Sequence, residues 1–236
     1  MIAAVVFALA AAGPAAGSEA QVRFTAAVEQ AKAHLLLCRE LYGARQVREA
    51  ALHASHPVQE LGGKIFGPIK RADAALGERV QTALKQPRRD VDAKVPRADF
   101  ERNLDATVAL LDEAVARVVP AAVTGGLSFK LAVLREMFAG LEKEYGEAEK
   151  KGKITQIVEY HDAYAFSARI QALYRDLAPA LRQASAPTPA VVEERLALLA
   201  RGFPGLTPPT SPIPMATLHE HLVAIARALD AVTSAS

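Results

Sequence analysis

The stretch FTAAVEQAKAHLLLCREL, residues 24–41, decides the fold class. Side chains at intervals of three and four residues share one stripe of this segment, and most of them are apolar: Phe24, Ala27, Ala31, His34, Cys38 and Leu41. Such a stripe predicts an amphipathic α-helix. Apolar residues keep helical spacing nearly everywhere after Ser18, and the breaks fall at Gly or Pro. The sequence therefore predicts an all-α protein, an irregular antiparallel bundle of about six to eight helices.

The Gly and Pro breaks set the expected helix boundaries. Pro57 suits the start of a helix, with Ser55 or His56 as its cap, because the missing proline N–H costs nothing there. Residues 86–96 read as a polar loop, and residues 203–214 as an extended Pro-rich linker. No fixed-period repeat is present, which argues against a solenoid. The other expected helices cover about 19–42, 45–54, 68–85, 99–119, 126–150, 154–184, 191–200 and 216–232.

Composition narrows the class of protein. The chain has 236 residues, a formal net charge of +2 and no tryptophan. Its Lys, Arg, Asp and Glu residues are interspersed, so the basic field that duplex nucleic acid demands is missing, and we expect no nucleic acid partner. Residues 18–236 are expected to form a single helical-bundle domain. Nothing in the composition forces oligomerisation, and a homodimer is left open.

The first residues are typical of an export signal. Residues 1–12 are apolar and uncharged, and Gly, Pro, Ala and Ser follow, so residues 1–17 are expected to be a cleaved signal peptide. No Lys or Arg precedes Arg23, and a retained N-terminal anchor is the alternative. The mature chain should then be periplasmic or secreted, with no membrane span. The single cysteine, Cys38, excludes an intramolecular disulfide and is expected to be a small buried side chain.

Several familiar catalytic motifs are missing. The sequence has no G-x-S-x-G elbow, no Walker loop, no C-x-x-C-H and no H-E-x-x-H. His219-Glu220-His221 resembles a metal motif, but residues two apart on a helix face different directions, so we expect one of its histidines to be exposed and one partly buried. The protein is therefore expected not to be an enzyme, although a metal-dependent hydrolase with Glu60 or Glu159 as general base remains a third alternative.

The remaining histidines fall at positions that can meet in space. A hairpin whose turn lies between Gly43 and Ala44 puts His34 and His53 at the same height, each about 14 Å from the turn at about 1.5 Å per residue. His56 follows three residues after His53, and Glu60 comes one turn later. In residues 154–184, an apolar stripe continues toward the helix start with two carboxylates, Glu159 and Asp162. Carboxylates are almost never buried unpaired. His161 lies on the neighbouring stripe.

Imidazole and carboxylate together suit iron, zinc or copper at neutral pH. The predicted metal-ligand pool is His34, His53, His56, Glu60, Glu159, His161 and Asp162. Each of these residues also has a purely structural interpretation: hydrogen-bonded core histidines, helix capping beside Pro57, or ion pairs with a neighbouring helix.

Two segments carry a resemblance. Residues 33–42 with the string His53-Ala-Ser-His56-Pro57-Val-Gln-Glu60-Leu61, and later residues 158–163, resemble a group of uncharacterised exported helical proteins of proteobacteria. More distantly, the chain is similar to the imelysin-like proteins of periplasmic iron acquisition, although His56 to Glu60 is one residue longer than that family's Gly-x-His-x-x-Glu. This resemblance implies a helical fold and a role with iron.

The leading hypothesis is an exported helical-bundle protein that binds a transition metal, iron, copper or zinc, or haem through the His and carboxylate cluster. The alternative is a non-catalytic structural or protein-interaction module of the periplasm, in which a partner protein replaces the ion and the same cluster is a buried polar network.

Overall fold

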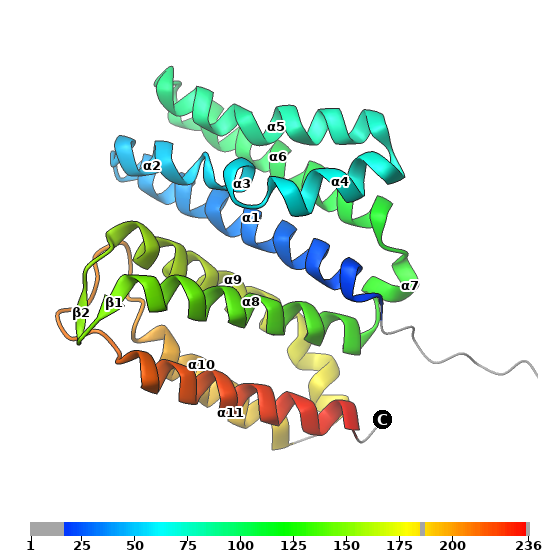
Figure 1. Ribbon diagram of the computed structural model, residues 1–236, viewed down its shortest axis with the longest axis vertical. Helices are drawn as coiled ribbons and strands as arrows, with labels where there is room; N and C mark the ends of the chain where they lie inside the picture. Colours follow the sequence, from blue (N-terminus) through cyan, green and yellow to red (C-terminus); the bar gives the residue numbers. More distant parts are fainter. Residues whose placement is uncertain (1–16, 185–186, 235–236) are drawn as a thin grey trace, which may run out of the picture.

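The computed structural model describes residues 17–184 and 187–234, and Figure 1 shows it as helices with one short hairpin. The all-α prediction is confirmed. Within the described residues there are eight helices of at least eleven residues and three shorter helical segments. The predicted signal peptide falls almost wholly on residues 1–16, outside the described residues.

The helices form two groups, and Figure 1 shows them one above the other. The first group contains α1 (Glu19–Gly43), the broken segment α2 (Val47–His53), α3 (His56–Gln59) and α4 (Gly62–Ala72), then α5 (Ala74–Asp92) and α6 (Arg97–Val118). The short α7 (Ala121–Thr124) leads to the second group, which contains α8 (Leu127–Ala148), α9 (Ile157–Ala184), α10 (Pro187–Ala200) and α11 (Met215–Ser234). Helix α1 packs on α6 within its own group and on α8 and α9 of the other.

This central position explains the burial of α1. Ser18 caps the helix: its hydroxyl accepts from the Gln21 amide at 3.2 Å, and the Gln21 side chain accepts from the Ser18 amide at 2.8 Å, a reciprocal capping box. Residues on the predicted stripe, such as Ala31 and Cys38, are fully buried. Leu35 and Leu37 lie off the stripe and are buried as well, because helices cover α1 on more than one side. His34 is thereby enclosed.

The largest error of the sequence-based helix boundaries lies between residues 62 and 96. The predicted helix over 68–85 is two helices, and the predicted loop over 86–96 is mostly the end of α5. Pro68 lies inside α4 and Pro87 inside α5, not at a start or an end. The true boundary is Asp73, whose carboxylate accepts the Leu76 amide at 2.9 Å as the cap of α5. Buried Leu84 and Val91 then hold α5 on the core as far as Asp92.

A short hairpin joins α8 to α9, at the break between the expected helices over 126–150 and 154–184. Strands β1 (Glu149–Lys150) and β2 (Lys153–Ile154) pair antiparallel, and Lys151 and Gly152 between them have φ values of 53° and 77°. The helices therefore end at Ala148 and begin at Ile157, a few residues inside the predicted limits of 150 and 154. The buried Glu149 side chain accepts from the amides of Gly152 and Met215, which ties this hairpin to the start of α11.

Residues 201–214, which include the predicted extended linker over 203–214, are non-helical. Side chains of α8 and α9 hold it in place through its backbone carbonyls. Tyr145 donates to Ile213 at 2.7 Å and Tyr160 donates to Gly205 at 3.0 Å. None of the helices in the described part of the chain combines the length and the apolar character that a bilayer crossing requires.

Candidate metal centre

The hairpin of α1 and α2 brings His34 and His53 together, as the count of residues from the turn predicts. The turn is made by Arg45 at φ 62°, and the Cys38 thiol donates to the Ala50 carbonyl at 3.2 Å, which fixes the register of the two helices. The ring centroids of His34 and His53 lie 6.3 Å apart. Cys38 points into this helix contact, and burial raises the pKa of its thiol to about 12. It is a structural side chain, as expected.

The break after α2 supplies the third imidazole. Helix α3 has only four residues, with Pro57 in its first turn, and the expected side-chain cap from Ser55 is not formed. The chain turns sharply between Ala54 and His56, so His56 returns toward the same point as His53, with ring centroids 4.9 Å apart. Glu60 is the C-cap of α3: its backbone is still helical and its amide donates to the His56 carbonyl, so it lies one turn after His56.

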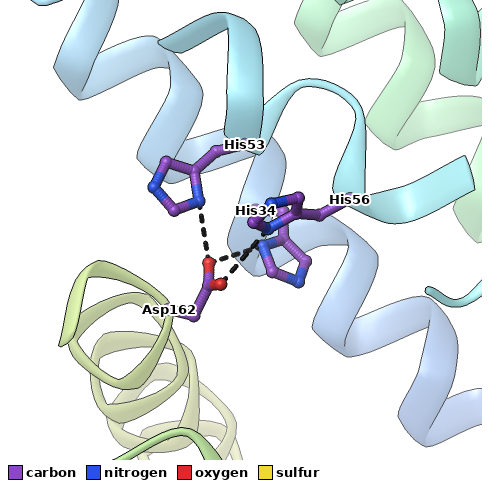
Figure 2. Close-up of side chains that lie close together, drawn as sticks. All are labelled: His34, His53, His56 and Asp162. Atoms are coloured by element: carbon purple, nitrogen blue, oxygen red, sulfur yellow. Dashed lines mark ion pairs between the residues drawn. The ribbon is translucent and has the colours of Figure 1, made fainter. Parts of the chain in front are cut away.

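Asp162 of α9 lies among these three rings (Figure 2). Its Oδ1 is 2.9 Å from Nδ1 of His34 and 2.8 Å from Nδ1 of His53, and its Oδ2 is 3.2 Å from Nδ1 of His56. One ligating atom from each of these four residues lies within 4.8 Å of the other three. The first helix group thus provides three imidazoles and the second provides one carboxylate.

The cluster is closed to solvent, and its polar atoms are poorly satisfied. His34, His53 and Asp162 are at most 2% exposed, and His56 is 9% exposed. Although the N···O distances are short, both ring nitrogens of His34 and His53, Nδ1 of His56 and Oδ1 of Asp162 lack a well-directed hydrogen bond. A buried polar atom without a partner costs about 1–3 kcal/mol. Donor atoms that converge on one point without bonding well to each other are what a metal ion requires.

The surroundings of the Asp162 carboxylate favour its ionised, negatively charged form although it is buried. Burial alone would raise the pKa of Asp162, but electrostatic attraction to His34 and the contacts with all three imidazoles hold this pKa well below its usual range. Burial lowers the pKa of His53 despite its contact with Asp162. For His56 burial acts in the same direction, but Asp162, Glu60 and Glu159 outweigh it, so its pKa is raised. An ionised Asp162 beside a neutral His53 is a ligand set ready for a cation.

Three predicted ligands lie outside this group of four. Glu60 Oε1 is 3.6 Å from His56 Nδ1, and its side chain is about half exposed, at 48%. His161 is buried at 2%, but its Nε2 lies 3.0 Å from the Leu206 carbonyl oxygen in the linker. Glu159 belongs to another cluster. The outlying histidines agree with their prediction: His219 is exposed and pairs with Glu142, whereas His221 is half-buried.

Glu159 joins two residues that the sequence analysis missed. Carboxylate oxygens of Glu144, Glu147 and Glu159 lie within 4.8 Å of one another, and Lys143 pairs with Glu144 at 2.9 Å and with Glu147 at 3.2 Å. The sequence feature that points to these two residues is the three-residue spacing of Glu144 and Glu147, which puts both on one face of α8. Burial, then Glu144, then the charges of Asp162 and Glu147 raise the pKa of Glu159 to about 7.

This shift gives a pH-dependent prediction. A carboxyl whose pKa rises from 4.5 to about 7 on folding stabilises the fold at low pH and loses that contribution as the pH rises through about 7. Glu159→Gln should therefore stabilise the metal-free protein by roughly 1 kcal/mol at pH 8, a figure reduced for solvent screening, and by almost nothing at pH 4.5. Urea unfolding in the presence of a chelator measures this difference. Glu136→Gln, at an exposed site of the neighbouring helix α8, is the control and should change neither value.

Comparison with known families adds one finding. Residues 120–236 match the iron permease-associated 4-helix bundle domain. This segment is a little less than half of the chain, and it relates the protein to an iron-associated helical family. No curated protein and no solved structure matches the chain. The similarity to imelysin-like proteins and to exported proteobacterial proteins stays a prediction, while its broader implication of a helical, iron-related family is supported.

The match divides the candidate metal centre. Helices α8 to α11, which form the second group, lie within the segment that matches the iron permease-associated bundle domain and carry Asp162, His161 and the three-glutamate cluster. His34, His53 and His56 precede it. The carboxylate of the centre thus comes from the matched bundle and its imidazoles come from the preceding helices.

Proposed function

We propose that this protein is an exported metal-handling protein that binds one transition-metal ion, iron in the first place, between its two helix groups. The ligands are His34, His53, His56 and Asp162. The observation that carries the proposal is the convergence of three buried imidazoles on one buried carboxylate, with ring nitrogens that lack hydrogen-bond partners. When bound, the ion supplies the positive charge that these groups surround, and Asp162 balances part of it.

The choice of ion rests on two separate arguments. Three imidazoles and one carboxylate suit iron, copper and zinc, and by affinity order alone copper and zinc would win. The match to an iron permease-associated domain favours iron. Four donors within 4.8 Å of one another fit a single ion, whose ligand distances are about 2.0–2.2 Å, better than they fit the wide slot of a haem. We therefore favour an ion over haem.

The burial of the site favours binding and transfer over catalysis. A catalytic metal keeps an open coordination position for water or substrate, whereas all four ligands here are at most 9% exposed. The family match suggests an iron permease as the partner with which the ion is exchanged. Export rests on the predicted leader in residues 1–17, and fractionation of cells that express the full chain tests it.

Metal analysis of protein purified without an affinity tag tests the central proposal. We expect about one equivalent of iron per chain, or one equivalent after anaerobic addition of Fe²⁺, and a rise in melting temperature with added ion. His219→Ala, which removes an exposed histidine, should bind like the wild type. If neither the native protein nor protein supplied with Fe²⁺, Cu²⁺ or Zn²⁺ retains an ion, and melting is unchanged, the cluster is the buried polar network of an interaction module and the proposal is wrong.

A further inference from the structure

His161 is the buried histidine that the four-ligand group leaves out. It immediately precedes Asp162 on α9 and is 2% exposed. The centroid of its ring lies 5.6 Å from that of His53, at an interplanar angle of 60°. The other two histidine rings around His53 belong to His34 and His56, which both face Asp162. His161 therefore contacts the centre without taking part in its group of converging donors.

The partner of His161 fixes its tautomer. Nε2 lies 3.0 Å from the carbonyl oxygen of Leu206, and a carbonyl only accepts, so Nε2 carries the proton and donates. In the neutral ring Nδ1 is then an acceptor. This Nδ1 is buried and has no hydrogen-bond partner.

His53 presents the complementary atom. Its Nδ1 faces Asp162 at 2.8 Å, while its Nε2 is buried and has no partner either. If Nδ1 binds the ion, the ring proton must stand on Nε2 and needs an acceptor. Metal-bound histidines almost always donate this second N–H, which sets the ring orientation and raises the basicity of the ligand.

We propose that His161 is a positioning residue for the metal ligand His53. When His53 Nδ1 holds the ion, Nδ1 of His161 would accept the Nε2–H of His53, a bond that neither atom makes in this structure. Nε2–H of His161 donates to Leu206, so the imidazole of His53 would be oriented from the linker between α10 and α11. The inference rests on the proposed metal site. It extends that site to the linker, because a series of contacts would run from the ion through His53 and His161 to the Leu206 carbonyl.

Three variants separate the two hydrogen bonds. His161→Asn keeps an acceptor near the position of Nδ1, whereas His161→Gln places its amide near Nε2 and keeps only the donor to Leu206. Tyr160→Phe is the matched control, since it removes the neighbouring bond to the linker carbonyl of Gly205 and leaves His161 intact. All are compared as full-length chains loaded with Co²⁺, whose visible spectrum reports ligand geometry, with affinity measured by chelator competition.

We expect His161→Gln to weaken Co²⁺ binding about 10- to 100-fold and to shift the spectrum, the usual effect of losing a group that orients a ligand. His161→Asn should restore most of the affinity, and Tyr160→Phe should change neither quantity. Equal affinity and spectrum for wild type and His161→Gln would overturn the inference and leave the metal site standing, as would a loss in Tyr160→Phe as large as that in His161→Gln. Absence of Co²⁺ binding to the wild type would instead count against the site itself.

Discussion

Asp162→Ala is expected to lower metal affinity more than 100-fold. Asp162 is the one carboxylate among the four converging donors, and it contacts all three imidazoles. Loss of a group that merely orients a ligand costs about 10- to 100-fold, so loss of a ligand that also balances the charge of the ion should exceed this. Chelator competition with Fe²⁺ under anaerobic conditions measures the effect.

The same substitution should destabilise the metal-free protein. Removing one partner of a buried ionic contact costs about 3–5 kcal/mol, because the other partner is left buried without compensation. Asp162→Asn keeps the shape and should lose affinity with a smaller loss of stability. Asp176→Asn, on an exposed face of the same helix, is the control for both measurements. Wild-type affinity in Asp162→Ala would show that the ion, if bound, lies elsewhere.

The sequence was sufficient to predict part of this centre. The heights of His34 and His53 follow from the rise of a helix and the position of one turn, so their meeting needed no tertiary information. Asp162 was noticeable as a carboxylate on an apolar stripe. Its separation from His161 follows from helix geometry, because adjacent residues on a helix point about 100° apart. Which of the two faces α1 and which faces the linker depends on how the two helix groups pack.

Two helix boundaries differ from the expected ones. The helix opened by Pro57 lasts one turn, and Glu60 is its C-cap, close enough to pair with His56. Gly and Pro breaks do not predict the boundary between α4 and α5, because it lies at Asp73, a good capping residue. Pro68 and Pro87 are tolerated inside helices whose apolar faces are anchored on the core. For these two prolines, packing on the core, which spacing alone does not reveal, decides the outcome.

Metal affinity is expected to fall steeply as the pH falls below neutral. Metal ligands must be deprotonated, so each proton that the ion displaces makes affinity change about tenfold per pH unit. Asp162 stays ionised across this range because its pKa is held well below normal, and burial keeps His53 neutral. The pKa of His56 is raised above its usual 6.5 despite burial, because Asp162, Glu60 and Glu159 favour its charged form. Protonation of His56 should therefore compete with binding of the ion.

Glu60→Gln distinguishes this account from one in which Glu60 is itself a ligand. Glu60 lies 3.6 Å from Nδ1 of His56 and raises the pKa of that ring. Removing its charge should move the loss of affinity to lower pH and leave affinity at pH 8 unchanged within a few-fold, whereas removing a ligand would weaken binding at every pH. Competition titrations from pH 5.5 to 8 separate the two outcomes. An affinity that stays flat over this range in the wild type would remove His56 from the ligand set, because no ring with a raised pKa could then be losing its proton to the ion.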